Sequence, residues 1–396
     1  MKMLAAVYRL CIITIVFGNF SQIFSDAIAV QEISVADLVA QNNTITYIKC
    51  DDAIPFNYQP FPFMAHEHLQ LYHGSFAETF ILKIPNGRAQ SHYGWVIIDD
   101  VYFINEMNWK HLYHHHCMID QVAPENISKL PGRVVVLGQL GFFQYWHWLS
   151  EILCRLAMVE QQGIEYDWLY VPFYDKFMKE TFDLWGIDTS KIIEPVGQNY
   201  AICADELILP SLVSNLHYGF VPYSCYPSHH LFDWVSQKLL QEALQRPVTC
   251  DLSKRIFVSR HDAPGRHVTN EDEVFELFEK HGFVRYQLSH LSIADQIQLF
   301  HQAEMIAGPA GTGITANSLY CKPGTKIIEL FQALGDCTMW IVAQHMQLAY
   351  TGVQTTDFVW DYQNCFGNTT MQLDAIERVL SDLAVGNLQS HYPLYG

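Results

Sequence analysis

The sequence predicts an α/β protein made of two successive α/β units, preceded by a mixed or β-rich N-terminal part. Three observations predict this. From residue 133 short apolar strands alternate with amphipathic helices, the alternation starts again after residue 254, and residues 28–130 show no clean period. Alternating strands and helices imply a parallel sheet with helices on both faces. A length of 396 residues suits two domains.

The first unit is expected to end with a helix that proline stops. Strands are predicted at residues 133–137, 168–171, 191–193 and 206–209, and helices at 146–161, 176–185 and 231–244. The last helix runs into Arg246-Pro247, where the helix cannot continue. The boundary between the units is therefore expected near residues 245–253. The predicted division is 1–27, 28–248 and 249–396.

The second unit has the order of a nucleotide-binding α/β unit. Strands are predicted at residues 255–259, 283–288, 305–307 and 326–330, and helices at 271–280, 293–302 and 312–320. Asn270 is expected to cap the first of these helices, and Gly282 to close it. Two such units in tandem place a cleft between them, where ligands commonly bind at the carboxyl ends of the strands.

The first 27 residues have the layout of a secretory signal. Lys2 and Arg9 precede the apolar stretch 10–17, and small residues follow up to Ala27. An uncleaved anchor and an ordinary helix remain alternatives, although the apolar stretch is short for a membrane span. The predicted location is the lumen of the secretory pathway or a bacterial periplasm or envelope. Any membrane tether is expected through this segment alone.

Charge and cysteine content exclude several classes of protein. Acidic residues outnumber basic ones 41 to 23, giving a net charge of -18 without a basic cluster. A nucleic-acid partner is therefore not expected, because it needs a positive surface. None of the ten cysteines forms a C-x-x-C pair, which argues against a zinc ribbon or redox motif. Disulfides are plausible in an exported chain, but the sequence does not pair them.

The first segment that could carry chemistry is residues 144–156, QYWHWLSEILCRL. On a helix His147, Glu151 and Arg155 form one stripe at spacings of four. A carboxylate held between an imidazole and a guanidinium could accept a proton from a sugar or protein hydroxyl. The alternative is an exposed ladder of ion pairs on a structural helix.

Three further segments point to a phosphate-containing ligand. Arg260 and Arg266 lie between a predicted strand and a predicted helix. The guanidinium group of arginine matches the geometry of phosphate oxygens, so these residues could bind a phosphate. The alternative is that the segment is only a charged surface loop. A glycine-rich turn at 308–313 would let backbone N–H groups approach a diphosphate. Glu329, at the end of a buried strand, could hold ribose hydroxyls or merely cap the next turn.

A metal site is not predicted. The sequence contains no Asp-x-Asp, so the usual carboxylate clamp for a metal-bound nucleotide sugar is missing. The adjacent residues His114, His115 and His116 cannot easily converge on one ion. Glu271 and Glu273 are assigned to the positive end of their helix.

In this order, the four segments resemble glycosyltransferase family 61. The family includes plant xylan-modifying transferases, EGF-domain-specific O-linked N-acetylglucosamine transferases and bacterial capsular polysaccharide transferases. The resemblance runs from about Gly138 to Leu330. It rests on an H-W-L-x-E helix, an S-R-x-x-A-x-x-R-x-x-x-N-E segment, a G-P-x-G-x-G turn and an I-E-L strand.

The resemblance implies a GT-B fold of two Rossmann-like domains facing a cleft, an inverting reaction and no required cofactor or metal. The partners would be a nucleotide-sugar donor and a glycan or glycoprotein acceptor. Arg260 and Arg266 would face the diphosphate, the backbone of Gly311, Thr312 and Gly313 would line it, and Glu329 would hold the ribose. Glu151, with His147 as second choice, would be the catalytic base.

Two residues depart from the family pattern. Ala310 stands where the family usually has His, and Cys154 where Pro is common. The missing imidazole motivates an alternative, a catalytically weak or inactive carbohydrate-binding relative. A dinucleotide oxidoreductase is a third reading, against which the glycine spacing argues.

Overall fold

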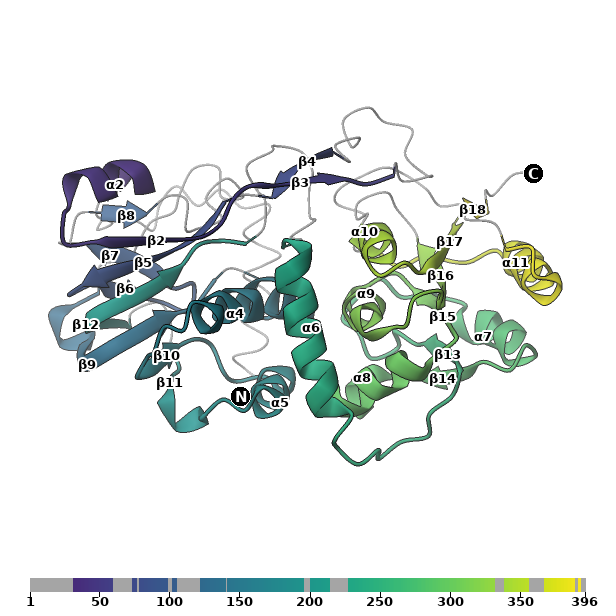
Figure 1. Ribbon diagram of the computed structural model, residues 1–396. Coiled ribbons are helices and arrows are strands. Elements are labelled where there is room, and N and C mark those ends of the chain that lie inside the picture. The colour runs from purple at the N-terminus through teal and green to yellow at the C-terminus, as the bar shows by residue number, and fades with distance from the viewer. Residues whose placement is uncertain are drawn as a thin grey trace, which may run out of the picture.

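The computed structural model of the chain has two β-sheets with a layer of helices between them (Figure 1). It describes residues 31–59, 73–76, 78–98, 102–104, 122–139, 141–195, 200–213, 227–331, 338–355, 367–388 and 391–392. The expected signal at 1–27 and the residues 114–116 lie outside these ranges. No helix in the described part is long and apolar enough to span a bilayer.

The first sheet is mixed and, within the described residues, has ten strands. These are β1 (Gln31–Ile33), β2 (Thr46–Asp51), β5 (Thr79–Pro85), β6 (Arg88–Gln90), β7 (Trp95–Ile98), β8 (Tyr102–Ile104), β9 (Ile127–Val136), β10 (Trp168–Tyr170), β11 (Ile192–Ile193) and β12 (Ala201–Pro210). Strands β12, β9, β10 and β11 are parallel neighbours, whereas β5 and β6 pair antiparallel with β12. The N-terminal part is β-rich, as the sequence predicted, but the sequence did not predict that its strands extend a parallel α/β sheet.

A separate hairpin, β3 (Ile54–Asn57) and β4 (His73–Phe76), leaves the end of β2 and reaches toward the second sheet (Figure 1). The helix α2 (Val35–Gln41) lies at the far end of the first sheet.

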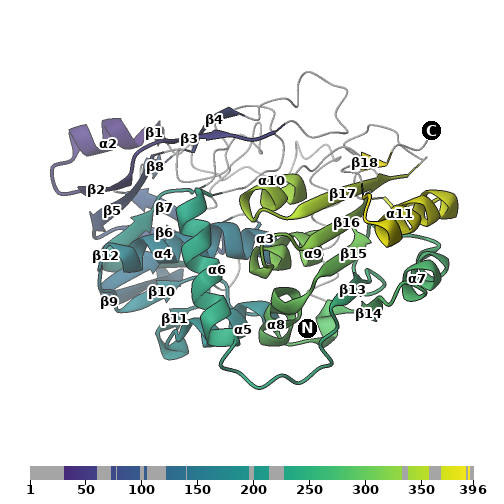
Figure 2. The ribbon, with the colours of Figure 1, turned by 45° about the vertical axis from the view of Figure 1, so that its right-hand side comes forward.

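The second sheet is parallel throughout its described strands, in the order β14-β13-β15-β16-β17-β18. Their bounds are β13 (Arg255–Val258), β14 (Val284–Tyr286), β15 (Met305–Pro309), β16 (Lys326–Phe331), β17 (Ala349–Gln354) and β18 (His391–Tyr392). Helices α7 (Glu271–Glu279) and α11 (Leu373–Val385) cover its outer face. Helices α8 (Ile293–Gln302), α9 (Thr312–Asn317) and α10 (Thr338–His345) cover its inner face (Figure 2).

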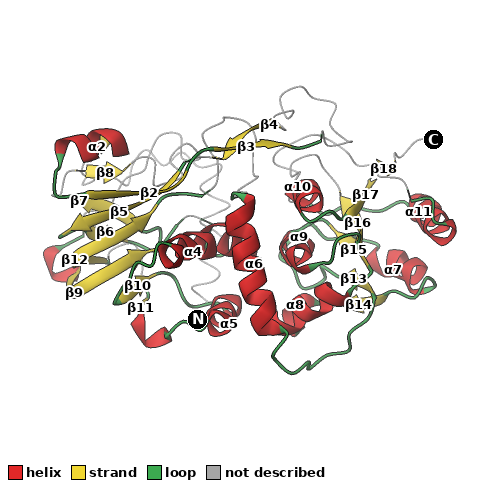
Figure 3. Cartoon of the chain, in the orientation of Figure 1, coloured by secondary structure: helices red, strands yellow, loops and turns green. Residues whose placement is uncertain are grey.

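The inner layer of helices joins the two sheets. From the first half it contains α4 (Cys154–Gln161), α5 (Lys176–Trp185) and α6 (His229–Ala243), with α6 standing between the sheets (Figure 3). Successive residues of a strand pack into different hydrophobic clusters. Val135 and Ile256 face the inner layer of helices, whereas Val134 and Phe257 lie on the outer faces of the first and second sheets, each in a separate cluster of buried side chains. Because successive side chains of a strand point to opposite faces, each sheet is buried on both sides.

Most predicted elements are confirmed, and two details of the helices are wrong. Helix 146–161 is interrupted: α3 (Tyr145–His147) leads into a π-helical segment, Trp148–Leu153, before α4. The Asn270 side chain does not cap α7, because it pairs with the backbone of Met371, donating to its carbonyl at 2.9 Å and accepting from its N–H at 2.9 Å.

Candidate functional site

The second predicted segment and the glycine turn meet at the carboxyl edge of the second sheet. Arg260 follows β13, and Gly311 follows β15, its neighbour in the sheet. A Cβ atom added to Gly311 would lie 1.9 Å from Nη1 of Arg260. Only glycine therefore leaves room for the guanidinium where it lies.

Arg260 is held in place by short contacts. Its backbone N–H donates to Glu271 at 3.1 Å, and its Nη2 donates to the carbonyl of Gly265 at 3.0 Å. Its Nε is buried and has no partner in the described part of the chain. Burial, and next the charge of Arg266, lower the pKa of Arg260 to about 10. The side chain is still a cation at neutral pH, with one buried donor that a ligand could use.

Glu271 is a residue of this site whose role the sequence did not reveal. It is 1% exposed, and it accepts hydrogen bonds from the Ser259 hydroxyl and the Arg260 N–H. Sequence reasoning assigned it to the helix dipole, which suits its place in the first turn of α7. Its direct contact with the end of β13 was not visible without the tertiary structure.

Glu329 lies beside the glycine turn, but not at the end of its strand as expected. Its strand continues for two residues, and it pairs in register with Gly308 of β15. The carboxylate is 4% exposed and accepts a hydrogen bond from the Tyr350 hydroxyl at 2.6 Å. Tyr350, a partner that the sequence did not suggest, therefore orients Glu329 from the next strand.

Gly308 itself is required by close packing. Its φ is +154°, and a Cβ there would lie 2.5 Å from the carbonyl oxygen of Val258. Past it, the N–H of Ala310 donates to the carbonyl of Leu330 at 2.8 Å. The turn is thereby anchored across the ends of β15 and β16.

His147 and Glu151 form a pair at the start of the interrupted helix. The Nδ1 atom of His147 lies 2.9 Å from Oε2 of Glu151, whose side chain is 1% exposed against 15% for His147. A buried carboxylate beside a more accessible imidazole is the arrangement in which the carboxylate orients the ring. Within the pair, the imidazole is the group that solvent or a ligand can reach.

Arg155 does not belong to this pair by hydrogen bonding. It is 1% exposed and donates to the carbonyls of Val136, Leu137 and Pro210, which tie β9 to the end of β12. Burial lowers the pKa of Arg155 to about 10. An exposed ladder of ion pairs on this helix is therefore excluded, because both Glu151 and Arg155 are buried.

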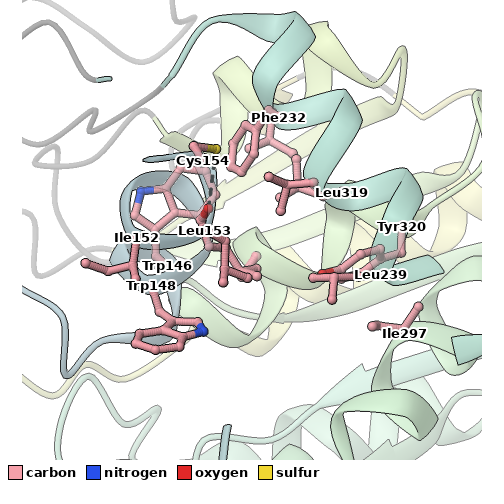
Figure 4. Close-up of a cluster of buried hydrophobic side chains, with 14 of the residues drawn as sticks. Trp146, Trp148, Ile152, Leu153, Cys154, Phe232, Leu239, Ile297, Leu319 and Tyr320 are labelled. Atoms are coloured by element: carbon pink, nitrogen blue, oxygen red, sulfur yellow. Dashed lines mark hydrogen bonds between the residues drawn. The ribbon is translucent and has the colours of Figure 1, made fainter. Parts of the chain in front are cut away.

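The π-helical segment packs the His147 helix against the second half of the molecule. Figure 4 shows Trp148, Ile152 and Leu153 in one cluster with Phe232 and Leu239 of α6 and with Leu319 and Tyr320, which follow α9. Helix α3 also packs against α9, the helix that Gly311 precedes. Residues from both halves of the chain thus converge on the glycine turn. Wide π turns frequently occur at functional sites.

The structure also shows how the potential metal ligands and the cysteines of the described residues are arranged. Among them no group of three or more His, Cys, Asp or Glu side chains is arranged to hold a metal ion. Five described cysteines, Cys50, Cys154, Cys203, Cys250 and Cys321, are free thiols.

The fold and the site define an α/β protein whose second sheet presents arginine, glycine and carboxylate at its carboxyl edge, as nucleotide-binding proteins do. Residues 145–328 match the family model Glycosyltransferase 61. This match, over a little under half of the chain, supports membership in glycosyltransferase family 61 and with it a glycosyltransferase activity. A search of curated proteins found no match.

Proposed function

We propose that the chain transfers a sugar from a nucleotide-sugar donor to a hydroxyl of a glycan or glycoprotein, in a GT-B arrangement with the donor on the second sheet. The contact of Arg260 with Gly311 carries this proposal, since it places a partly buried cation against bare backbone at the strand ends. Residues 28–248 would form the acceptor side and residues 249–396 the donor side.

The donor side would bind the diphosphate through the positive charge of its arginines and through backbone N–H groups. Arg260 offers a buried Nε–H, and the charge of Arg266 is close enough to lower the pKa of Arg260. Thr312 and Gly313 open α9, where the first N–H groups have no partner within the helix. Arginines that stabilise the leaving diphosphate would replace a metal ion, so no cofactor is required. Glu329, oriented by Tyr350, would accept hydrogen bonds from the ribose.

On the acceptor side we assign the proton transfer to His147, with Glu151 orienting its ring. The acceptor oxygen would attack the anomeric carbon from the face opposite the phosphate, and the sugar–phosphate bond would break with inversion. The hydroxyl proton would pass to the imidazole, and the bonding electrons would leave with the nucleoside diphosphate. The greater exposure of His147 supports this order of roles.

The test is calorimetric titration with a panel of UDP- and GDP-hexoses and UDP-pentoses. Arg260→Ala is expected to weaken donor binding by about 10- to 100-fold, because a charge-assisted hydrogen bond contributes about 1.5–3 kcal/mol. The matched control is Arg246→Ala, which removes an exposed arginine paired with Asp183 and should leave binding unchanged. Absence of binding across the panel, or equal binding by Arg260→Ala, would contradict the proposal.

A second candidate is a catalytically weak or inactive carbohydrate-binding relative, which Ala310 favours. The turn there has a methyl group in place of the imidazole usual in the family. Such a protein would bind donor or glycan without releasing nucleotide. Acceptor-dependent release of nucleoside diphosphate by the purified protein would exclude it.

We further propose that residues 1–27 direct the chain into the secretory pathway or a bacterial envelope, as a cleaved signal or an anchor. The basic-apolar-small pattern of this segment supports the proposal. N-terminal sequencing of the mature protein tests it.

A further inference from the structure

A pocket of about 600 Å³ lies between the β3–β4 hairpin, the first turn of α6 and the last turn of α10. Figure 1 shows the hairpin reaching across the top of α6 to α10, so the walls come from both halves of the chain. None of the residues assigned above to the donor or the proton transfer lines it. Its volume is in the range of sites for small ligands.

One wall of the pocket is aromatic. The rings of Phe56 and Phe76 have centroids 5.0 Å apart, and Phe56 and Tyr58 have centroids 5.3 Å apart. The ring of His229 lies 5.6 Å from Phe76 and 5.8 Å from Tyr58. These rings offer apolar faces to the C–H groups of a ligand.

Next to these rings the pocket is lined by a pair of stacked imidazoles, each with a hydrogen-bond partner. His229 and His345 lie with centroids 4.0 Å apart and an interplanar angle of 18°. The Tyr58 hydroxyl is 2.6 Å from Nε2 of His229, and Nε2 of His345 is 2.8 Å from a carboxylate oxygen of Asp233. Burial, with the nearby His345, lowers the pKa of His229 to about 4, so this ring is neutral at physiological pH.

The two sides of the pocket are tied together by hydrogen bonds. The backbone N–H of Gln59 donates to Gln344 at 2.6 Å, and its carbonyl accepts from the Trp340 indole at 2.7 Å. The hairpin is therefore fastened to α10 at the rim. A pocket built this way needs little reorganisation when a ligand enters.

The lining selects the class of ligand by its charge. Among the described residues the lining contains no Lys, Arg, Asp or Glu, and the nearby carboxylates of Asp51 and Asp233 are each within hydrogen-bond distance of a histidine. A diphosphate would find no Lys or Arg counter-charge among these described side chains. A neutral pyranose ring, with apolar C–H faces and hydroxyls at its rim, matches aromatic faces beside imidazole, hydroxyl and amide groups.

We propose that this pocket binds a neutral sugar residue of the acceptor glycan, at a site separate from the donor and from His147. The proposal rests on the proposed function, since it assumes a glycan acceptor. The pocket would select acceptors by a sugar that does not itself react.

The experiment probes the full chain on an array of neutral and acidic oligosaccharides, then titrates the strongest neutral ligand. Phe56→Ala removes the central ring and is expected to weaken binding at least about tenfold. Ile54→Trp is a second variant, since Ile54 is exposed at the rim and a large ring there would obstruct the pocket without disturbing the core. Phe275→Ala, which removes a partly buried ring on α7, is the matched control.

Donor binding is titrated in parallel and separates the two proposals. Loss of glycan binding in both pocket variants, with donor binding intact, supports the inference. Unchanged glycan binding in both variants, a preference for acidic glycans, or binding of none of the neutral ones overturns it. If the wild-type chain binds glycan through the pocket but no nucleotide sugar, the proposed transfer fails while the pocket stands.

Discussion

At the scale of single residues, the site depends on how Arg260 is held. Its guanidinium lies against Gly311, and its backbone N–H donates a hydrogen bond to the Glu271 carboxylate. The arginine and the glycine could be predicted, because their residue types and their places between strand and helix indicate phosphate chemistry. Glu271 could not, because an acid in the first turn of a helix has an adequate local explanation.

Glu271→Gln is predicted to weaken donor binding about tenfold and to cost about 1–3 kcal/mol of unfolding free energy. The amide has one acceptor oxygen, so either the Ser259 hydroxyl or the Arg260 N–H loses its acceptor. Titration with the tightest nucleotide sugar, alongside urea unfolding, measures both effects.

The control for that change is Glu273→Gln, which alters an exposed acid in the same turn of α7. If both variants bind donor equally well, Glu271 only stabilises the helix and does not position Arg260.

At the scale of elements, the sequence pattern predicted those helices whose bounds are set by interactions between residues near in sequence. Helices α5 and α8 have the predicted bounds, since each combines an apolar stripe with a capping side chain, Asp175 or Ser292. The π-helical segment was not predicted, because its six residues are all buried and tertiary packing decides their register. The pairing of β5 and β6 with β12 was also missed, because it joins residues more than a hundred positions apart.

Asp295 of α8 is predicted to stabilise the connection between the two units. Its carboxylate is 1% exposed, and it accepts bonds from the Thr249 N–H at 2.9 Å and the Ser292 hydroxyl at 2.8 Å. Burial alone would raise the pKa of Asp295, but hydrogen bonds from Thr249 and Ser292 outweigh it and hold the pKa below its usual range. Asp295→Asn is expected to cost about 2–4 kcal/mol at neutral pH.

The pH dependence of that difference follows from the sign of the shift. A carboxylate with a lowered pKa stabilises the fold above its unfolded pKa, and this contribution is lost as pH falls below about 4. The gap in unfolding free energy between wild type and Asp295→Asn should therefore narrow in acid. Asp374→Asn, at an exposed aspartate in the first turn of α11, is the control, and a gap for Asp295→Asn that stays constant with pH would contradict the assignment.

At the scale of the whole molecule, one continuous core joins the two sheets. The inner cluster contains Ile81 and Ile208 from the first sheet and Ile306 and Ile327 from the second, with helix residues such as Leu239 between them. Neither half can bury its inner face without the other. We therefore predict a single cooperative thermal transition, with calorimetric and van't Hoff enthalpies in agreement.

Leu239→Ala should lower the temperature of that one transition, because a buried leucine replaced by alanine costs about 2–5 kcal/mol. Leu244→Ala, at an exposed position just beyond the same helix, should leave it within about 0.5 kcal/mol. Two resolved transitions, only one of which shifts in Leu239→Ala, would show that the halves unfold independently.

The sequence by itself determined the order of strands and helices, the α/β class, and the residue types at the proposed phosphate-binding edge. These depend on periodicity, capping and side-chain chemistry, which act over a few residues. Only the tertiary structure decided that Glu271 holds Arg260, that Glu151 is buried beneath His147, and that a hairpin closes a pocket over α6 and α10. Those contacts join distant segments, and long-range packing, which no local pattern encodes, sets them.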